Sequence, residues 1–418
     1  MRTIAAARAV PNATRAWRTA AVLAALALAA AGCGSAHDGP KDGSGGSSTG
    51  AAAPAKGESW SLKYVDKVAD GELTAVTATS ADDIWAAGYE RRDGAMDDPD
   101  DQYLLHYEGG EWQRQQAPAV LDGNIFQPRL DSSGPDDVWL FASGHDAASV
   151  SVARWDGSGW QRVPSPPGAV VDTKVFAPDD VWALSGQQQA YHWDGGRWSV
   201  HELPADATAL GGAAGDDLWA VGFRSSGPGV GGEGGELNQP AAMHWDGSSW
   251  KITPTPTYRF PDPVPPEAGA SLDGVEVVSP KEAWAYGSHD FNHGEVEQEP
   301  KIEHILLRWD GSRWHQEKRA EQDPCLSRDI YTHGADGGLL FGVGRYRSPQ
   351  GRCTKLSWPR LPVQGEITAQ SRQRLWLDPI VQVPGTRKFV GAGKVYVTQS
   401  GNPLTLPAVA TYEPRRGD

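Results

Sequence analysis

The chain has 418 residues, and its 53 Asp and Glu outnumber its 38 Lys and Arg, giving a formal net charge of -15 at pH 7. Such an acidic balance argues against nucleic acid and against direct docking on anionic lipid. Tryptophan is frequent, with 18 residues, whereas cysteine occurs only three times.

The first 32 residues have the organisation of a signal peptide. A basic stretch contains Arg2, Arg8, Arg15 and Arg18. Residues 20–31 are apolar, but this stretch of about a dozen residues is too short to span a bilayer as a mature helix. It ends in Ala-Ala-Gly-Cys33, which resembles the lipobox of bacterial lipoproteins, although Ala30 stands where Leu is preferred. An ordinary secretory peptide with an incidental cysteine is the alternative.

The lipobox resemblance implies cleavage before Cys33 and acyl chains on that cysteine. Several acyl chains anchor a protein stably, since one chain alone binds only marginally. The residues up to 57 are mostly Gly, Ser, Ala and Lys and are typical of a flexible tether. We therefore expect a signal peptide over 1–32, a lipidated Cys33 with a tether over 33–57, and a folded domain over 58–418, anchored at the outer side of the cell membrane.

Two short phrases recur along this domain. Copies of the first, such as DDVWALS, occupy residues 82–88, 136–142, 179–185, 216–222, 281–287 and 373–379. Copies of the second, such as HWDGSSW, occupy residues 154–160, 192–198, 244–250 and 308–314, with a looser copy at 106–112. Self-similarity at this period indicates one supersecondary unit used many times.

The first complete unit contains four predicted strands. Alternating apolar residues predict strands at 73–78, 84–89 and 103–107, and Trp112 begins a fourth that ends by Pro118. Asp-Gly between aromatic residues is a strong hairpin signal. Four antiparallel strands in a repeated unit are typical of a blade of a β-propeller. The fold class is therefore all-β, with a single propeller.

Seven second strands are predicted, although six or eight blades also fit because the last two units are degenerate. Their markers are Trp85, Trp139, Trp182, Trp219, Trp284, Leu340 and Trp376. Trp60 resembles the start of a fourth strand with no first three before it, and residues 408–413 resemble a third strand with no fourth after it. We expect the N-terminal strand to complete the C-terminal blade, because a closed ring leaves no open sheet edges.

The regular recurrence of tryptophan favours packing between blades over a row of sugar-stacking platforms. Trp358 alone falls outside the motifs in the folded domain, where we expect the third strand of the sixth blade. The repeats resemble those of secreted bacterial propellers grouped loosely with kelch and galactose-oxidase-like folds. This resemblance implies the fold and is nearly silent on function, because propellers host both enzymes and binding platforms.

The two remaining cysteines, Cys325 and Cys353, predict a disulfide, since the exterior of a cell is oxidising. A metal pair would lack companion ligands at useful spacing. The repeated carboxylates are expected to be structural, because Asp in a turn hydrogen-bonds its own backbone. They are Asp83, Asp137, Asp180 and Asp217 before the tryptophans, and Asp156, Asp194, Asp246 and Asp310 in the WDG turns.

Three irregular loops on one face are better candidates for a binding site. The first contains Asp97, Asp98, Asp100 and Asp101, whose oxygens suit Ca²⁺, although a solvated acidic loop is favoured. The second contains His289, Asp290 and His293, which suit Zn²⁺ or Cu²⁺ if they converge, as residues four apart do on a helix but not on a strand. The third, 254–270, is Pro-rich with Tyr258 and Phe260 and indicates a binding edge or merely a long extended connection.

Signatures of catalysis are missing from the sequence: it has no Ser-centred nucleophile elbow, no HExxH and no phosphate-binding loop. The sequence therefore favours a monomeric binding or scaffold module over an enzyme. Its expected partner is an extracytoplasmic protein or glycan. No cofactor is predicted, with Ca²⁺ or a transition metal left open. The alternative is a glycan-processing hydrolase or lyase that uses carboxylates at the propeller funnel.

Overall fold

The computed structural model divides the chain into two units, Met1–Pro54 and Ala55–Asp418. The residues it describes all lie in the second unit. They are 58–66, 70–91, 101–123, 125–144, 149–225, 237–292, 301, 303–317, 324–327, 330–398 and 403–415. The predictions for Cys33, Asp97, Asp98, Asp100 and His293 fall outside these residues.

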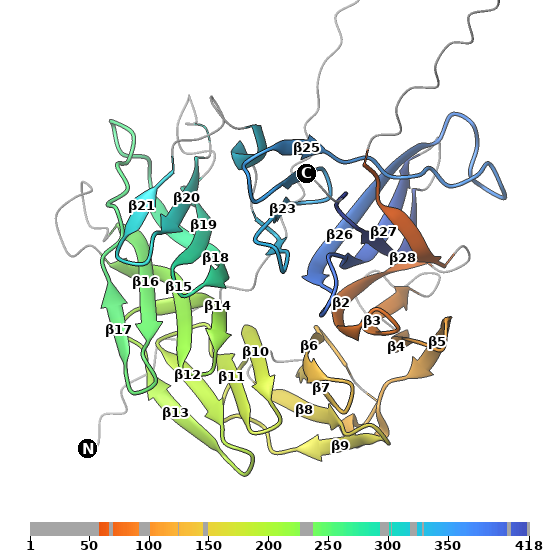
Figure 1. Cartoon of the computed structure of the whole chain (residues 1–418), viewed down its shortest axis with the longest axis horizontal. Helices are drawn as coiled ribbons and strands as arrows, with labels where there is room; N and C mark the ends of the chain where they lie inside the picture. Colours follow the sequence, from red (N-terminus) through yellow and green to blue (C-terminus); the bar gives the residue numbers. More distant parts are fainter. Residues whose placement is uncertain are drawn as a thin grey trace, which may run out of the picture. The chain divides into compact units, whose positions relative to one another are not determined.

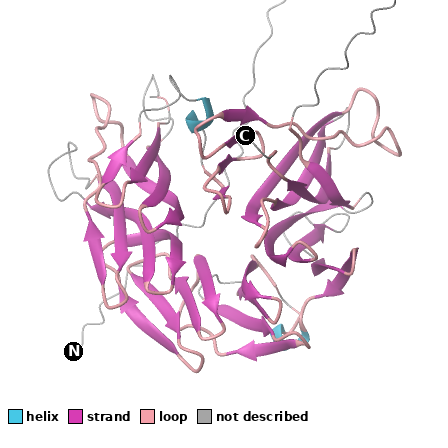
Figure 2. Cartoon of the chain, in the orientation of Figure 1, coloured by secondary structure: helices cyan, strands magenta, loops and turns pink. Residues whose placement is uncertain are grey.

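Nearly all regular structure in the described residues is β-strand (Figure 2), which confirms the all-β class. Helical structure there is limited to two short 3-10 turns, η1 (Ala119–Leu121) and η2 (Pro324–Ser327). Neither of these turns has the length and apolarity needed to cross a bilayer.

Three four-stranded sheets come first, each antiparallel and paired in chain order. The first contains β2 (Asp70–Ser80), β3 (Asp83–Arg91), β4 (Asp101–Glu108) and β5 (Glu111–Gln116). The second contains β6 (Arg129–Gly134), β7 (Asp137–Ser143), β8 (Val150–Trp155) and β9 (Trp160–Val163). The third contains β10 (Asp172–Ala177), β11 (Asp180–Leu184), β12 (Gln189–Trp193) and β13 (Trp198–Glu202).

An eight-stranded sheet follows, built from two groups of four strands. The fourth group contains β14 (Asp206–Ala214), β15 (Asp217–Ser225), β16 (Asn238–Trp245) and β17 (Trp250–Thr253). The fifth contains β18 (Gly269–Ser279), β19 (Glu282–Asp290), β20 (His304–Trp309) and β21 (Trp314–Gln316). A single parallel pair, Asn238 with Gly269, connects β16 to β18.

Two further sheets contain the last strands. The sixth group is short: β22 (Thr332–His333), β23 (Leu339–Phe341), β24 (Arg345–Arg347) and β25 (Cys353–Lys355). The seventh group is long: β26 (Arg372–Gln382), β27 (Phe389–Thr398), β28 (Leu404–Tyr412) and then β1 (Ser61–Val65). Strand β1 pairs antiparallel with β28, and Ser61 lies opposite Thr411.

The sheets have the arrangement of a β-propeller. The first strand of each group contacts the first strand of the next, from β2 through β6, β10, β14, β18 and β22 to β26, and β26 contacts β2 (Figure 1). Apolar clusters fill the spaces between neighbouring groups. In one of them, Trp85 packs at 5.2 Å from Trp155 and 5.3 Å from Trp160 of the following group, measured between ring centroids. Trp85, Trp155 and Trp160, which belong to copies of the two repeated phrases, therefore pack between sheets, as predicted.

Two sequence predictions are wrong. Trp376 lies on β26, the first strand of its group, not on a second strand, and 43% of it is exposed. Trp358 follows the fourth strand β25 and does not lie in a third strand. By contrast, Leu340 lies on the second strand β23 and is fully buried, as predicted.

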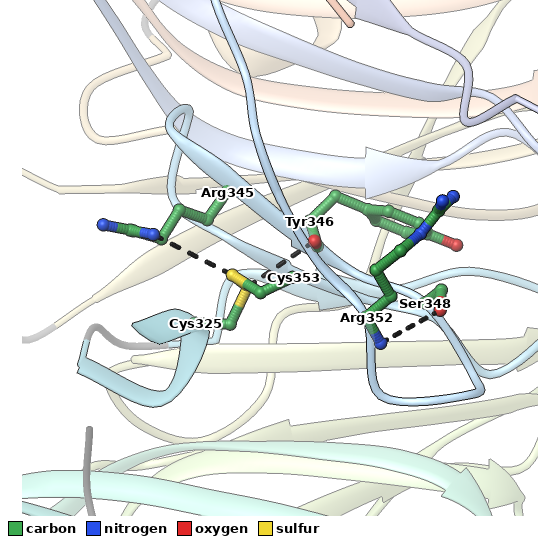
Figure 3. Close-up of a disulfide and its surroundings, with 6 residues drawn as sticks. All are labelled: Cys325, Arg345, Tyr346, Ser348, Arg352 and Cys353. Atoms are coloured by element: carbon green, nitrogen blue, oxygen red, sulfur yellow. Dashed lines mark hydrogen bonds between the residues drawn. A yellow bond between two sulfur atoms is a disulfide. The ribbon is translucent and has the colours of Figure 1, made fainter. Parts of the chain in front are cut away.

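The predicted disulfide is confirmed. Cys325 of η2 and Cys353 of β25 are bonded with a Cα–Cα distance of 5.6 Å (Figure 3). The bond connects the segment before the sixth sheet to the outer strand of that sheet, whose strands have only two or three residues each. It therefore fixes the group that has the fewest ladder hydrogen bonds.

Candidate functional site

An acid, a tryptophan and a base form a unit that recurs in the first five groups. The acid begins the second strand, the tryptophan lies two residues later, and the base lies opposite the tryptophan on the third strand. The acid–base distances are 2.7 Å for Asp83–His106, 2.5 Å for Asp137–Arg154, 2.9 Å for Asp180–His192, 2.7 Å for Asp217–His244 and 3.1 Å for Glu282–Arg308.

The base of this unit also contacts the tryptophan ring. His106 stacks on Trp85 with 3.7 Å between ring centroids, and Arg308 lies 5.3 Å from the ring centroid of Trp284. Burial would raise the pKa of Asp83, but hydrogen bonds from His106 and Thr79 lower it. A unit repeated in five groups is a structural device. The role of its base was not predicted from the sequence, although His or Arg stands one residue before each WDG and before the looser YEG.

The carboxylates of the WDG turns are structural as well. Asp156 Oδ1 accepts hydrogen bonds from the backbone N–H groups of Ser158 at 2.9 Å and Gly159 at 3.0 Å, and the other three turns repeat this pattern. Hydrogen bonds from the Ser158 hydroxyl and from these N–H groups lower the pKa of Asp156 to about 2. These carboxylates therefore hold turns, as the sequence predicted.

Charged side chains on the first strands are the first candidate for chemistry. Asp131 of β6 accepts a hydrogen bond from the backbone N–H of Val175 on β10 at 2.9 Å. Asp172 of β10 accepts one from the N–H of Leu210 on β14 at 2.8 Å. Farther along, His333 Nδ1 of β22 lies 2.9 Å from Glu276 Oε2 of β18. These contacts all run from one group to its neighbour.

Lys174 of β10 interacts electrostatically with three of these carboxylates. Burial raises the pKa values of Asp131 and Asp172, and the positive charge of Lys174 partly offsets this. Burial would lower the pKa of Lys174, but the carboxylates of Asp131, Glu276 and Asp172 raise it. The cluster is thus a mutually compensated set of charges whose oxygens bind neighbouring backbone, which is the arrangement expected of a contact between sheets.

The Pro-rich loop between β17 and β18 forms the second candidate. Tyr258 is only 8% exposed, and its backbone is held from both sides by Gln239: the Gln239 amide oxygen accepts from Tyr258 N at 2.8 Å, and its Nε2 donates to Tyr258 O at 3.3 Å. The Tyr258 hydroxyl donates to Glu303 Oε2 at 3.0 Å. Phe260 packs against the Tyr258 ring at 5.1 Å. Both predicted binding residues therefore stabilise the loop from within.

His289 lies in the same cluster, in contact with Tyr258, Phe260 and Phe291. Its side chain is fully buried, and neither ring nitrogen has a hydrogen-bond partner among the residues that the structure describes. Burial lowers the pKa of His289, against the opposing effect of Glu303 and Asp290. The burial of His289 therefore favours the neutral imidazole.

The residues predicted to bind metal do not converge where the structure describes them. His289 and Asp290 are successive residues of β19, so they point to opposite faces, and Asp290 is exposed. Asp101, the described member of the acidic loop, begins β4 opposite Glu90. In the described ranges, no group of three or more His, Cys, Asp and Glu side chains has an arrangement that could hold a metal ion.

No protein-family model matches the chain, and no curated protein matches it. Among solved structures, it is similar to YCF48 from Cyanidioschyzon merolae, with 12% identity, a TM-score of 0.45 and coverage of 86% of this chain and 99% of that one. YCF48 bound to D1 peptide gives 12% identity, a TM-score of 0.47 and the same coverage. The β-propeller domain of the Trilobed protease from Pyrococcus furiosus gives 6% identity and a TM-score of 0.45, with coverage of 80% of this chain and 95% of that one.

Proposed function

We propose that this chain is a lipid-anchored, extracytoplasmic lipoprotein whose seven-bladed β-propeller acts as a binding or scaffold module for a protein or glycan. The proposal of an anchor rests on the lipobox-like sequence at Cys33 and on the tether that follows it. The proposal of seven blades counts the eight-stranded sheet as two, since one parallel pair connects its halves. Ring closure is supported by the pairing of β1 with β28 and by the contact of β26 with β2.

The observation that carries a binding role is the order of the Pro-rich loop. A loop of this length between two strands is usually mobile, and ordering it on binding costs free energy. Here Gln239, Glu303 and the aromatic cluster around His289 hold the loop in one conformation before any ligand arrives. Preorganisation of this kind favours recognition, because the entropy cost of ordering has already been met in folding.

The charged side chains on the first strands support binding over catalysis. A glycan-processing enzyme needs two carboxyl groups free to exchange protons and contact substrate. Asp131 and Asp172 instead each accept two backbone N–H hydrogen bonds, from Ser132 and Val175 and from Thr173 and Leu210 respectively. Their oxygens are thus engaged in connecting adjacent strands.

The test is crosslinking of the tagged, full-length protein in its own cells, followed by capture and mass spectrometry. We expect one dominant extracytoplasmic partner, lost when residues 259–266 are replaced by Gly and Ser and retained when the exposed turn residue Arg197 is replaced by Ser. Catalytic cleavage of an envelope glycan by the purified protein, at a rate typical of an enzyme, would contradict a binding role. Fractionation of a Cys33→Ala variant tests the anchor, since we expect that variant to leave the membrane fraction.

A further inference from the structure

Charge is strongly segregated along the folded chain. Residues 58–338 contain 47 Asp and Glu against 20 Lys and Arg, a net charge of -27. Residues 339–398, which include β23 to β27, contain ten Lys and Arg against two Asp and Glu, a net charge of +8. From residue 58 onward, an otherwise acidic chain therefore has one basic region, and it coincides with the sheets that depart from the repeat.

One face of β26 and β27 changes character along its length. On β27, Val390 and Ala392 are buried against the first sheet, and Lys394 forms an ion pair with Glu72 of β2 at 2.7 Å. Beyond this pair the same face is open, since Tyr396 is 36% exposed and Trp376 is 43% exposed. This face of β26 and β27 is therefore covered by the first sheet near Val390 and Ala392 and exposed near Trp376 and Tyr396.

Four side chains share this open face. The register places Arg372 opposite Thr398, Arg374 opposite Tyr396 and Trp376 opposite Lys394. The intervening residues Leu375, Leu377, Val395 and Val397 point the other way and are buried against the sixth group. We call Arg372, Arg374, Trp376 and Tyr396 the β26–β27 patch. Among the described residues, neither arginine has an ion-pair partner, so both guanidinium groups are free to meet a ligand.

We propose that the β26–β27 patch binds an extended acidic peptide segment of a partner protein. This inference rests on the proposed binding function and names a second binding surface, in addition to the Pro-rich loop, and its chemistry. Arg372 and Arg374 are two residues apart on a strand, about 7 Å along it, and carboxylates two residues apart in an extended peptide have the same spacing. Trp, Tyr and Arg are the residue types that dominate binding energy at protein interfaces.

The surrounding charge favours a short acidic segment over a long polyanion. A nucleic acid or long acidic polysaccharide would run off the patch and over a body with a net charge of -27. Repulsion between the polyanion and the acidic residues around the patch acts over about 8–10 Å at physiological salt. This distance exceeds the spacing of neighbouring strands. A segment of a few acidic residues keeps its charge on the patch and avoids this repulsion.

The experiment measures binding of a labelled peptide of alternating Glu and Thr to the full chain in detergent, by fluorescence anisotropy. We expect binding that weakens with salt, that falls by about tenfold or more in an Arg372→Glu, Arg374→Glu variant and that falls by roughly fivefold in Trp376→Ala. A matched variant, Arg197→Glu with Lys355→Glu, makes the same charge change on exposed residues outside the patch and is expected to bind normally.

Equal binding by the peptide with Lys in place of Glu, or no loss in the Arg372→Glu, Arg374→Glu variant, would overturn the proposal. Tighter binding of a uronate oligosaccharide of equal charge would overturn it in favour of an acidic glycan. The same variants in the crosslinking test separate the two proposals. A partner still captured by Arg372→Glu, Arg374→Glu contradicts the patch and leaves the scaffold function standing, whereas no partner for the unaltered protein contradicts the function itself.

Discussion

The first five groups of strands and the last two solve the same packing problem differently. In the first five, a buried second-strand tryptophan contacts an acid–base pair of its own group, as in Trp85 with His106 and Asp83. In the sixth group, a disulfide and strands of two or three residues replace that unit. In the seventh, where β26 to β28 have nine to eleven residues each, the tryptophan of the repeated phrase lies on the first strand and is exposed.

The first five groups share one structural constraint, and the last two groups do not. Each repeated group must fit the next, so its acid, tryptophan and base are copied together. The last two groups contain the basic residues, the exposed Trp376 and the pairing of distant strands. In a propeller built of similar units, the features that break the repeat are therefore the ones to examine for function.

The comparison predicts opposite outcomes for two tryptophans. Trp139 is fully buried and its Nε1 donates to Asp137 Oδ1 at 2.9 Å, so Trp139→Ala is expected to destabilise the protein by about 3–5 kcal/mol. Trp376→Ala is expected to change stability by no more than about 0.5 kcal/mol. Urea unfolding followed by circular dichroism measures both; comparable losses would show that the second region is as tightly packed as the first.

Removal of the disulfide is the next largest effect. Cys325 and Cys353 are 28 residues apart, and a loop of this size is worth about 3–4 kcal/mol in the chain-entropy model. The Cys325→Ala, Cys353→Ala variant is expected to lose this amount and to lose hydrogen-exchange protection first around β24 and β25. Uniform loss of protection across all groups would mean that the sixth sheet has no separate weakness.

Removing the positive charge of Lys174 from the first strands is expected to lower stability by a smaller amount that depends on pH. Lys174→Met removes the charge that most offsets the burial of Asp131 and that acts, together with Arg129, on Asp172, so we expect a loss of about 1–3 kcal/mol at pH 7. The folded-state pKa values of both carboxyls lie above the unfolded ones, so the folded state binds more protons as pH falls, and the loss shrinks from pH 7 towards about 4. The free energy of unfolding of both proteins, measured across this pH range, tests the prediction. A loss of stability that does not depend on pH would assign Lys174 a packing role only.

Glycines give the smallest contrast. Gly247, in a WDG turn, has φ of 83°, so Gly247→Ala is expected to cost about 1 kcal/mol. Gly344 lies between β23 and β24, and a Cβ there would meet no atom within 4 Å, so Gly344→Ala is expected to fall within about 0.5 kcal/mol of the unaltered protein. Thermal melts of the two variants compare the regions directly, and equal shifts would contradict a special role for the turn.

The sequence predicted the repeated strands well and the irregular ones poorly, for a physical reason. A second strand lies inside its sheet, and the two faces of that sheet pack against different neighbouring groups, so residues on both faces are buried, as Trp85 and Ala86 are. QRLWLDP looks similar as a phrase, yet it lies on an edge strand where Trp376 can be exposed. Only strand pairing distinguishes the two cases, and pairing depends on residues far away in the chain.

The candidate site was harder to predict than the fold. Tyr258 and Phe260 were correctly placed in an irregular loop, but whether an aromatic ring points outward or packs inward depends on partners such as Gln239 and His289. His289 and Asp290 looked like joint ligands, and strand geometry separates them. The β26–β27 patch needed the register of β26 and β27 before its four residues could be recognised as neighbours.

The pairing of β1 with β28 has a consequence for the order in which the molecule can be assembled. The Tyr412 hydroxyl donates to Glu58, a contact between residues 354 positions apart. A ribosome delivers β1 long before β28, so β1 has no partner while all the intervening strands are being made. The last sheet can therefore be completed only after residue 412 has been made. Its completion is a late step in the folding of the propeller.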